Sequence, residues 1–319
     1  LVMASRPEWF RTLFGFHEAT YHTTKQQLQF DPRTWTLTAP NGKSFAAGAF
    51  SCSSVADLRA RAVGTAPKGP VTVSHVAVGD VLPLHAQHPG ATFQVASQFN
   101  CLEMINPSVT PDRGVTCYAH DPTQGPACAL ACAAATVVRN YYIPVGDQEG
   151  QTRECQLNNL RGVEELIGNP KERYWEVRNG YTGSTTAAQL TAAAAAVDRV
   201  GYEACVDAVR VGWQQQCQVC FKDRYVVCEP GVLVNQVFCS AASVSYSGIA
   251  PRPWTTVGRV CLDGAYEATL WAGALAPAPP GPPAGPRTVW LTFLGGGAFG
   301  NPQEWIVAAI GRALARAEA

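Results

Sequence analysis

The sequence predicts a mixed α/β fold in which a mostly parallel sheet is sandwiched between helices. Residues 71–78, 93–99 and 288–294 are apolar or β-branched runs with the pattern of buried strands. Residues 127–140 and 302–314 have the composition or apolar periodicity of helices. Strands that alternate with helices along a chain favour a sheet covered on both faces.

The composition supports a large core and excludes two classes of partner. The 319 residues are 47% hydrophobic, and 24 basic side chains balance 24 acidic ones. Without a basic surplus we expect no nucleic-acid partner, and without a membrane-length apolar run we expect no membrane partner. The 12 cysteines are too sparse for a disulfide scaffold. Several lie in apolar runs, so we expect reduced thiols and a cytoplasmic location.

Residues 1–69 are expected to form an N-terminal extension that packs on the core. Aromatic side chains recur through helix-like segments of residues 1–30. Residues 34–38 and 43–50 have strand-like patterns around the turn sequence at residues 40–42.

Residues 70–319 are expected to form the main domain. We interpret residues 144–230 as an insertion, in which Thr186 and Gln189 resemble a capping box before an alanine-rich helix. The low-complexity, proline-rich segment 275–286 is expected to be a flexible loop.

The strongest functional signal is a glycine-rich stretch that follows the 288–294 strand. Asn301 is a candidate N-cap for the next helix, with Pro302 at its first position and Glu304 closing a capping box. Such a turn offers free N–H groups and the positive end of a helix dipole to an anion. The stretch therefore predicts a phosphate site, and the alternative is a tight turn without a ligand. Its residues are Gly295, Gly296, Gly297, Ala298, Phe299, Gly300 and Asn301.

A second helix start has the same character. Gly125 and Pro126 open the helix at 127–140 without a capping side chain, so its N–H groups are available. Thr123, Gln124 and Gly125 are the expected ligand contacts, although a helix of small residues can also serve only to pack closely on a sheet.

Two polar residues follow predicted strands. Asp80 comes after the 71–78 strand, and Asn100 after the 93–99 strand. Ligands of α/β sheets bind at the carboxyl ends of strands, so we expect both residues to share one crevice with the glycine loops. Alternatively, each residue only caps a turn or a strand end.

These segments together resemble the macro domain, an α/β fold that binds ADP-ribose. Residues 78–81 resemble its Gly-Asp-Ile segment, whose Asp accepts from the adenine amino group. Residues 96–100 resemble the strand end whose Asn faces the distal ribose. Residues 114–127 take the place of the first phosphate loop, and residues 295–302 resemble the second, which wraps the diphosphate.

The resemblance covers roughly residues 70–135 and 230–319, with departures. The first loop lacks the family's glycine triplet, and the paired Gln-Glu-Glu signature of poly(ADP-ribose) glycohydrolases is absent. Residues 236–241 and 262–270 look more like the divergent MavL-type hydrolases, which remove ADP-ribose from arginine, including arginine on ubiquitin.

The resemblance therefore implies an ADP-ribosylhydrolase acting on a modified protein, with no cofactor and no metal ion. Cleavage at the anomeric carbon passes through an oxocarbenium-like state and needs carboxylates to handle protons and the guanidinium. The candidates are Asp263 and Glu267, which stand four apart on one helix face, and then Asp121 and Glu103. Asp263 and Glu267 could instead form a solvated helix face, and Asp121 could belong to a turn.

Other readings stay open. The chain could be a module that binds ADP-ribose without turnover, or an unrelated α/β phosphate-binding enzyme. Cys217-x-x-Cys220, with Cys228 and Cys239, is a weak zinc pattern because its spacing is irregular. Cys117 with His120 is an equally weak nucleophile pair.

Overall fold

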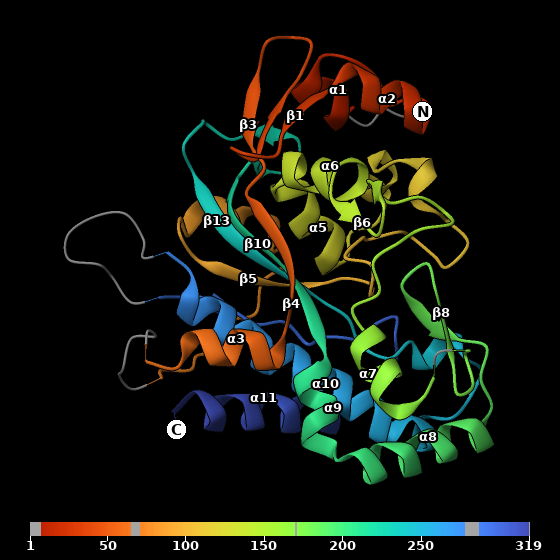
Figure 1. Ribbon diagram of the computed structural model, residues 1–319. Helices are drawn as coiled ribbons and strands as arrows, with labels where there is room; N and C mark the ends of the chain where they lie inside the picture. Colours follow the sequence, from red (N-terminus) through yellow and green to blue (C-terminus); the bar gives the residue numbers. More distant parts are fainter. Residues whose placement is uncertain (1–7, 65–70, 170, 278–286, 319) are drawn as a thin grey trace, which may run out of the picture.

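A five-stranded sheet forms the centre of the protein, which a computed structural model describes over residues 8–64, 71–169, 171–277 and 287–318 (Figure 1). β5 is parallel to β14 and β13, whereas β10 is antiparallel to β13 and β4. The mixed α/β class is confirmed, but the sheet is less parallel than predicted. Its strands lie in the order β14 (Val289–Trp290), β5 (Thr92–Ala96), β13 (Leu233–Cys239), β10 (Arg210–Gln218) and β4 (Ala49–Ser54).

One face of the sheet is covered by α10 (Pro251–Leu275), which contacts β10 and β13. Glycines on this helix permit close approach, since a Cβ on Gly264 would lie 2.5 Å from Cβ of Val209. Predicted helices at 186–201, 261–271 and 302–314 lie in this layer. The helices packed around α10 are α3 (Val55–Ala62), α8 (Ala187–Val200), α9 (Tyr202–Ala208) and α11 (Gln303–Glu318) (Figure 1).

The other face carries α5 (Gln124–Ala131) and α6 (Ala133–Tyr141), which contact β5 and β10 respectively. The sequence predicted one helix here, but the structure has two, because the helical conformation is interrupted at Cys132. The carbonyl of Ala131 accepts instead from the amide of Cys220, at 2.6 Å. A partner from outside the helix thus interrupts the regular hydrogen-bond ladder. The small side chains of both helices are buried against the sheet.

The N-terminal segment contributes to the central fold as well as covering it. Its first part holds two helices and a three-stranded antiparallel sheet. β4 then pairs with β10 along the sheet edge, and α3 packs on α10. The elements of the first part are α1 (Trp9–Phe14), α2 (Tyr21–Gln27), β1 (Gln29–Asp31), β2 (Thr36–Thr38) and β3 (Ser44–Ala46).

The segment expected to be an insertion, residues 144–230, includes β10, a strand inside the sheet. It also holds α7 (Arg161–Ile167) and six short hairpin strands: β6 (Pro144–Val145), β7 (Gln148–Glu149), β8 (Glu176–Arg178), β9 (Tyr181–Gly183), β11 (Phe221–Asp223) and β12 (Val226–Val227). The remaining elements are α4 (Leu82–Gln87) and the 3₁₀ turns η1 (Pro111–Arg113), η2 (Thr116–His120) and η3 (Val244–Tyr246).

One predicted strand does not form, and another is shorter than predicted. Residues 71–78 are exposed and pair with no strand of the described chain. The 288–294 run is a strand only at β14, because side chains take over its amides beyond that point. Gln94 Oε1 accepts from the amide of Thr292 at 3.1 Å, and the Tyr266 hydroxyl accepts from that of Leu294 at 3.0 Å.

Most of the proline-rich loop falls in residues 278–286, outside the described part of the chain. In the parts that are described, no helix combines the length and the hydropathy needed to cross a bilayer.

Candidate functional site

The two glycine loops lie at the carboxyl ends of neighbouring parallel strands. β5 and β13 continue to pair just beyond their ends, where the Ser97 amide donates to the Cys239 carbonyl at 2.8 Å. At the first loop, a Cβ on Gly125 would lie 2.0 Å from the Ala96 carbonyl oxygen. At the second, a Cβ on Gly295 would lie 2.5 Å from Cβ of Ala241. Only glycine permits these approaches, which bring both loops to one edge of the sheet.

The second loop exposes backbone amides. Gly295 and Gly300 have φ of 72° and 69°, in the left-handed region, and the Asn301 amide closes the loop by donating to the Gly295 carbonyl at 2.9 Å. Gly297 and Ala298 are exposed, and their amides donate to no acceptor in the described chain. Consecutive free amides of this kind are suited to donate to an anion.

The first loop is held by a side chain. The Gln124 side chain accepts from the Ala96 amide at 2.8 Å and donates to the Gln94 carbonyl at 2.7 Å. It thus replaces a strand partner beside β5, where β14 has ended. Because its amide group is occupied, Gln124 can serve a ligand only through its backbone. Thr123 is exposed, and its amide donates to Asp121 Oδ1 at 2.9 Å.

An aromatic cluster connects the two loops. The ring of Tyr181 lies 5.3 Å from that of Phe299, in the second loop, and 5.2 Å from that of Tyr246. The pKa of Tyr181 is raised, chiefly by burial and then by the nearby Tyr246 and Asp121. Phe299 of the second loop therefore contacts this tyrosine, and the charge of Asp121 in the first loop acts on it through space. We call residues 121–125, Tyr181, Tyr246 and residues 295–301 the strand-end site.

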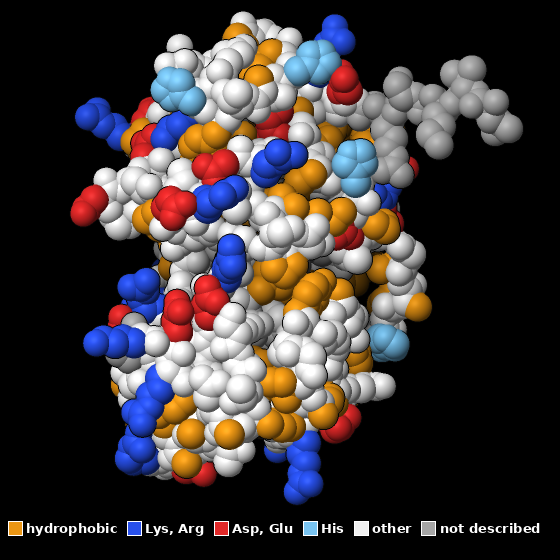
Figure 2. Space-filling model, turned by 90° about the vertical axis from the view of Figure 1, so that its right-hand side faces the viewer, with side chains coloured by type: hydrophobic (Ala, Val, Ile, Leu, Met, Phe, Trp, Pro, Cys, Tyr) orange, Lys and Arg blue, Asp and Glu red, His pale blue; other side chains and the backbone are white. Residues whose placement is uncertain are grey.

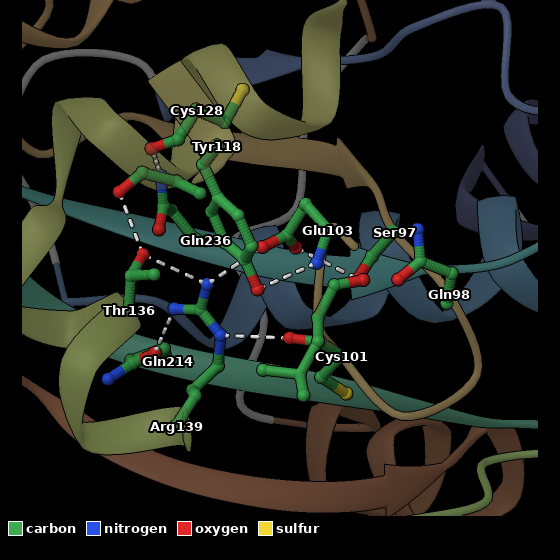
Figure 3. Close-up of polar contacts among 12 residues, drawn as sticks. Ser97, Gln98, Cys101, Glu103, Tyr118, Cys128, Thr136, Arg139, Gln214 and Gln236 are labelled. Carbon is green, nitrogen blue, oxygen red and sulfur yellow. Dashed lines mark hydrogen bonds and ion pairs between the residues drawn. The ribbon is translucent and has the colours of Figure 1, made fainter. Parts of the chain in front are cut away.

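A buried ion pair lies beneath the first loop (Figure 3). Glu103 accepts from the Ser97 hydroxyl at 2.9 Å and pairs with Arg139 of α6 at 3.4 Å. A Cβ on Gly125 would lie 3.2 Å from Cγ of Glu103, so this carboxyl group underlies the first turn of α5. Burial raises the pKa of Glu103 to about 7, against the opposing effects of Arg139 and Ser97. Such a group can hold or release a proton near neutral pH.

Arg139, Tyr181 and Tyr246 were missed by the sequence reasoning. A single arginine within an apolar, alanine-rich helix was the available signal for Arg139, because such a residue is seldom buried without a partner. The two tyrosines carry no comparable signal, since they come from separate segments that only the fold brings together.

Asp80 and Asn100 are occupied by structural bonds. Asp80 accepts from the Leu82 amide at 3.0 Å and pairs with Arg224 at 2.6 Å. Asn100 is fully buried, donates to Gln156 at 2.8 Å and accepts from the Leu102 amide at 3.1 Å. For both residues the structure shows the turn-capping alternative, so we leave them out of the strand-end site.

Asn301 does not cap α11, which begins at Gln303. Its side chain donates instead to the Ala242 carbonyl at 2.8 Å and holds the second loop against the end of β13. The predicted N-cap is therefore wrong, although the residue stays part of the loop. Glu304 is exposed on the first turn of α11.

Asp263 and Glu267 lie in a buried network between helices. Asp263 accepts from the Tyr202 hydroxyl at 2.7 Å, and Glu267 pairs with Arg59 at 2.5 Å and Arg312 at 2.6 Å. These partners belong to α9, α3 and α11, which pack with α10 in the helical layer on one face of the sheet. The burial of Asp263 and Glu267 shows that the solvated-face alternative is wrong. Because these partners engage both carboxylates, we leave the two acids out of the strand-end site, and their catalytic assignment stays a prediction.

We expect Glu267→Gln to lower stability and to leave ligand binding unchanged. Burial opposes ionisation, but hydrogen bonds from Arg59, Trp271 and Arg312 hold the pKa of Glu267 below its ordinary value. The ionised carboxylate therefore stabilises the fold above pH 4.5, the ordinary pKa, and this stabilisation is lost as pH falls through the lowered value. At pH 7 the variant should lose about 2 kcal/mol of unfolding free energy in urea titrations.

The exposed Glu304→Gln in α11 serves as the control and should change stability by less than about 0.5 kcal/mol. If Glu267→Gln kept full stability and lost hydrolysis, the catalytic assignment of this residue would have to be restored.

The cysteine alternatives gain no support. All 12 cysteines are free thiols, and no group of three or more metal-ligand side chains forms within the described ranges. Burial raises the pKa of Cys117 to about 11, with a further contribution from Glu18, so this thiol is protonated at neutral pH.

Comparison of the chain with protein-family models, curated proteins and solved structures gave no match. The functional argument therefore rests on the residues and on the geometry of the strand-end site.

Proposed function

We propose that the strand-end site binds ADP-ribose and that the protein hydrolyses the bond joining ADP-ribose to a modified protein side chain, with arginine as the favoured linkage. The observation that carries this proposal is the pairing of two glycine loops at the ends of adjacent strands. The second loop presents exposed backbone amides without an internal acceptor, the first opens α5 at Gln124 and Gly125 without a capping side chain, and the half-buried carboxylate of Asp121 belongs to the first loop.

The loops have the chemistry that a diphosphate requires. The exposed amides of Gly297 and Ala298 and the amides of Gln124 and Gly125, which open α5, are the donors, and the α5 dipole adds positive potential. The Gln124 side chain holds the start of α5 in place, so the donors of this helix cost little reorganisation when an anion binds. Phe299 and Tyr246 add partly exposed rings, which suit the ribose or adenine of the same ligand.

Asp121 is the residue we assign to the chemical step. Oδ1 is held by the Thr123 amide, and Oδ2 receives no hydrogen bond from any described residue. A carboxylate so placed can hold the guanidinium of a modified arginine, or take a proton from the attacking water. Glu103 is fully buried, so we assign it a positioning role beneath α5.

The alternative function is a module that binds ADP-ribose without turnover. It is favoured by one observation: the carboxylates of Asp263 and Glu267 are engaged by Tyr202 and Arg312, which leaves the strand-end site with fewer acids for catalysis. The two functions differ in the release of ADP-ribose from modified peptides. The most direct experiment incubates the protein with peptides carrying ADP-ribose on arginine, serine or glutamate, and measures released ADP-ribose.

We expect Asp121→Asn to reduce release of ADP-ribose from modified arginine at least about 100-fold, because the amide cannot act as a base. Asparagine still accepts the Thr123 amide, so affinity for free ADP-ribose in calorimetry should change less than about threefold. The exposed Asp147→Asn is the control and should keep wild-type activity. Full activity in Asp121→Asn would remove this residue from the mechanism, and no release by the wild type would favour the binding module.

A further inference from the structure

A pocket lies beside the β8–β9 hairpin and shares no lining residue with the strand-end site. Its volume is about 340 Å³, within the range of roughly 300–1,000 Å³ for small-molecule sites. Three segments form it: the turn around Ser108, the stretch from Arg153 to Arg161, and the tip of the β8–β9 hairpin. Nothing in the proposed function uses this pocket.

Three arginines line the pocket. Arg153, Arg161 and Arg178 are exposed, and none forms a salt bridge among the described residues, although the charge of Arg161 acts on Glu164 one helical turn away. One acid, Glu154, also lines the pocket, so the positive charges outnumber the negative. Charged side chains of both signs are scattered over the side of the molecule that carries β8 (Figure 2). Three guanidinium groups line this one cavity.

The wall of the pocket next to the arginines is formed by Gln156 and Asn179, whose side-chain amides are hydrogen-bonded within the protein. Gln156 accepts from Asn100 at 2.8 Å and donates to Asn179 at 2.7 Å. Asn179 has a φ of 48°, which is uncommon outside glycine, and its own amide donates to the Pro107 carbonyl. Since these amides are satisfied within the protein, the free donors of the pocket are the guanidinium groups.

The wall also separates this pocket from the strand-end site. Gly180 follows Asn179, and a Cβ on it would lie 2.6 Å from Cβ of Gln98. Its carbonyl accepts from the Phe99 amide at 3.0 Å, and the next residue is Tyr181 of the strand-end site. The hairpin turn thus presents one side to the arginines and the other to the aromatic cluster.

We propose that this arginine pocket binds a phosphate-bearing small molecule at a site distinct from the glycine loops. Planar guanidinium forks match phosphate oxygens in pairs, and they keep their charge at any physiological pH. The shared wall means that a ligand here contacts the segment that positions Tyr181. The proposal stands on the arginines and the cavity, and does not depend on the identity of the ligand at the strand-end site.

The test uses inorganic pyrophosphate in calorimetry, on a Gly297→Glu background that closes the glycine loop. We expect that background to retain one pyrophosphate site. Adding Arg153→Gln and Arg178→Gln should weaken it at least tenfold. The control pair Arg33→Gln and Arg199→Gln, both exposed and away from the pocket, removes the same charge and should change affinity less than twofold.

Two results would overturn the proposal: no pyrophosphate binding in the Gly297→Glu background, or equal weakening by the control pair. Failure of the glycine-loop assignment gives a different result, because wild type and Gly297→Glu would then show the same stoichiometry while the arginine variants still lost binding. Titrations with AMP and with inorganic phosphate then distinguish a nucleotide from the free anion as the ligand class.

Discussion

Gly297→Glu should reduce the affinity for ADP-ribose at least about 1,000-fold, a loss of roughly 4 kcal/mol. The substitution places a carboxylate beside the amides that would receive the diphosphate, and like charges at this range cost several kcal/mol. The fold should tolerate it. A Cβ on Gly297 meets no atom within 4 Å, and this glycine is not among those with positive φ.

Gly297→Ala is the matched control, since it adds a side chain without charge. We expect its affinity to fall less than about tenfold and its urea unfolding curve to overlay that of Gly297→Glu. Calorimetry with ADP-ribose, ATP and NAD measures both variants and the preference of the wild type. Wild-type affinity in Gly297→Glu would remove the loop from the ligand site, and equal affinity for all three ligands would favour an unrelated phosphate-binding protein.

Arg139→Met should have the largest effect on stability, a loss of about 3–5 kcal/mol of unfolding free energy. The arginine is fully buried, and besides Glu103 it donates to Cys101, Gln214 and Thr136 (Figure 3). Its guanidinium carbon also lies 3.7 Å from the centre of the Phe238 ring. Removing it leaves a buried carboxyl group and several acceptors without their donor.

The loss should depend on pH because of Glu103. Its pKa rises from an ordinary 4.5 to about 7 in the fold, so the folded state binds this proton more tightly than the unfolded state. This contribution to stability is complete below pH 4.5 and declines as pH rises through about 7. Without Arg139 the ionised form is still less favourable, so the defect of Arg139→Met should be larger at pH 8 than at pH 5.

The double variant Glu103→Leu with Arg139→Met provides the control. Replacing both charges with apolar groups should recover at least about 1.5 kcal/mol of the loss, because no buried charge is then left without a partner. Urea titrations at the two pH values measure all three proteins. An equal loss at pH 5 and pH 8 would show that Glu103 does not carry the pH dependence.

The sequence predicts local structure well where the determinants are local. The Thr186 side chain accepts from the Gln189 amide at 3.2 Å, as the motif indicates, and α8 begins where expected. The glycine loop was recognisable because strand, glycines and helix start are consecutive. In contrast, the 288–294 strand is cut short by Gln94 and Tyr266, which are distant in sequence and whose reach no local pattern reveals.

The site acids show the same limit. Asp263 and Glu267 lie on one helix face, as their spacing predicts, but spacing does not tell which neighbour that face meets. The two arginines that pair with Glu267 are Arg59 and Arg312, which are far apart in the chain. Asp121 was a weak candidate in sequence because Asp-Pro pairs are common in turns. It becomes the stronger one because the carboxylates of Asp263 and Glu267 are engaged by Tyr202, Arg59 and Arg312, whereas Asp121 accepts only from the Thr123 amide among the described residues.

The hydrogen bonds between the Gln124 side chain and β5 hold the first loop of the strand-end site more rigidly than the second loop is held. The first loop is fastened to the sheet by two bonds of the Gln124 side chain, whereas the second is held at its base by Asn301 and leaves the exposed amides of Gly297 and Ala298 unbonded at its tip. A diphosphate should therefore dock first against the more rigid first loop, and the second loop should then adjust around it. The entropic cost of ordering on binding would fall mainly on residues 295–300, which makes that loop the natural place to tune affinity.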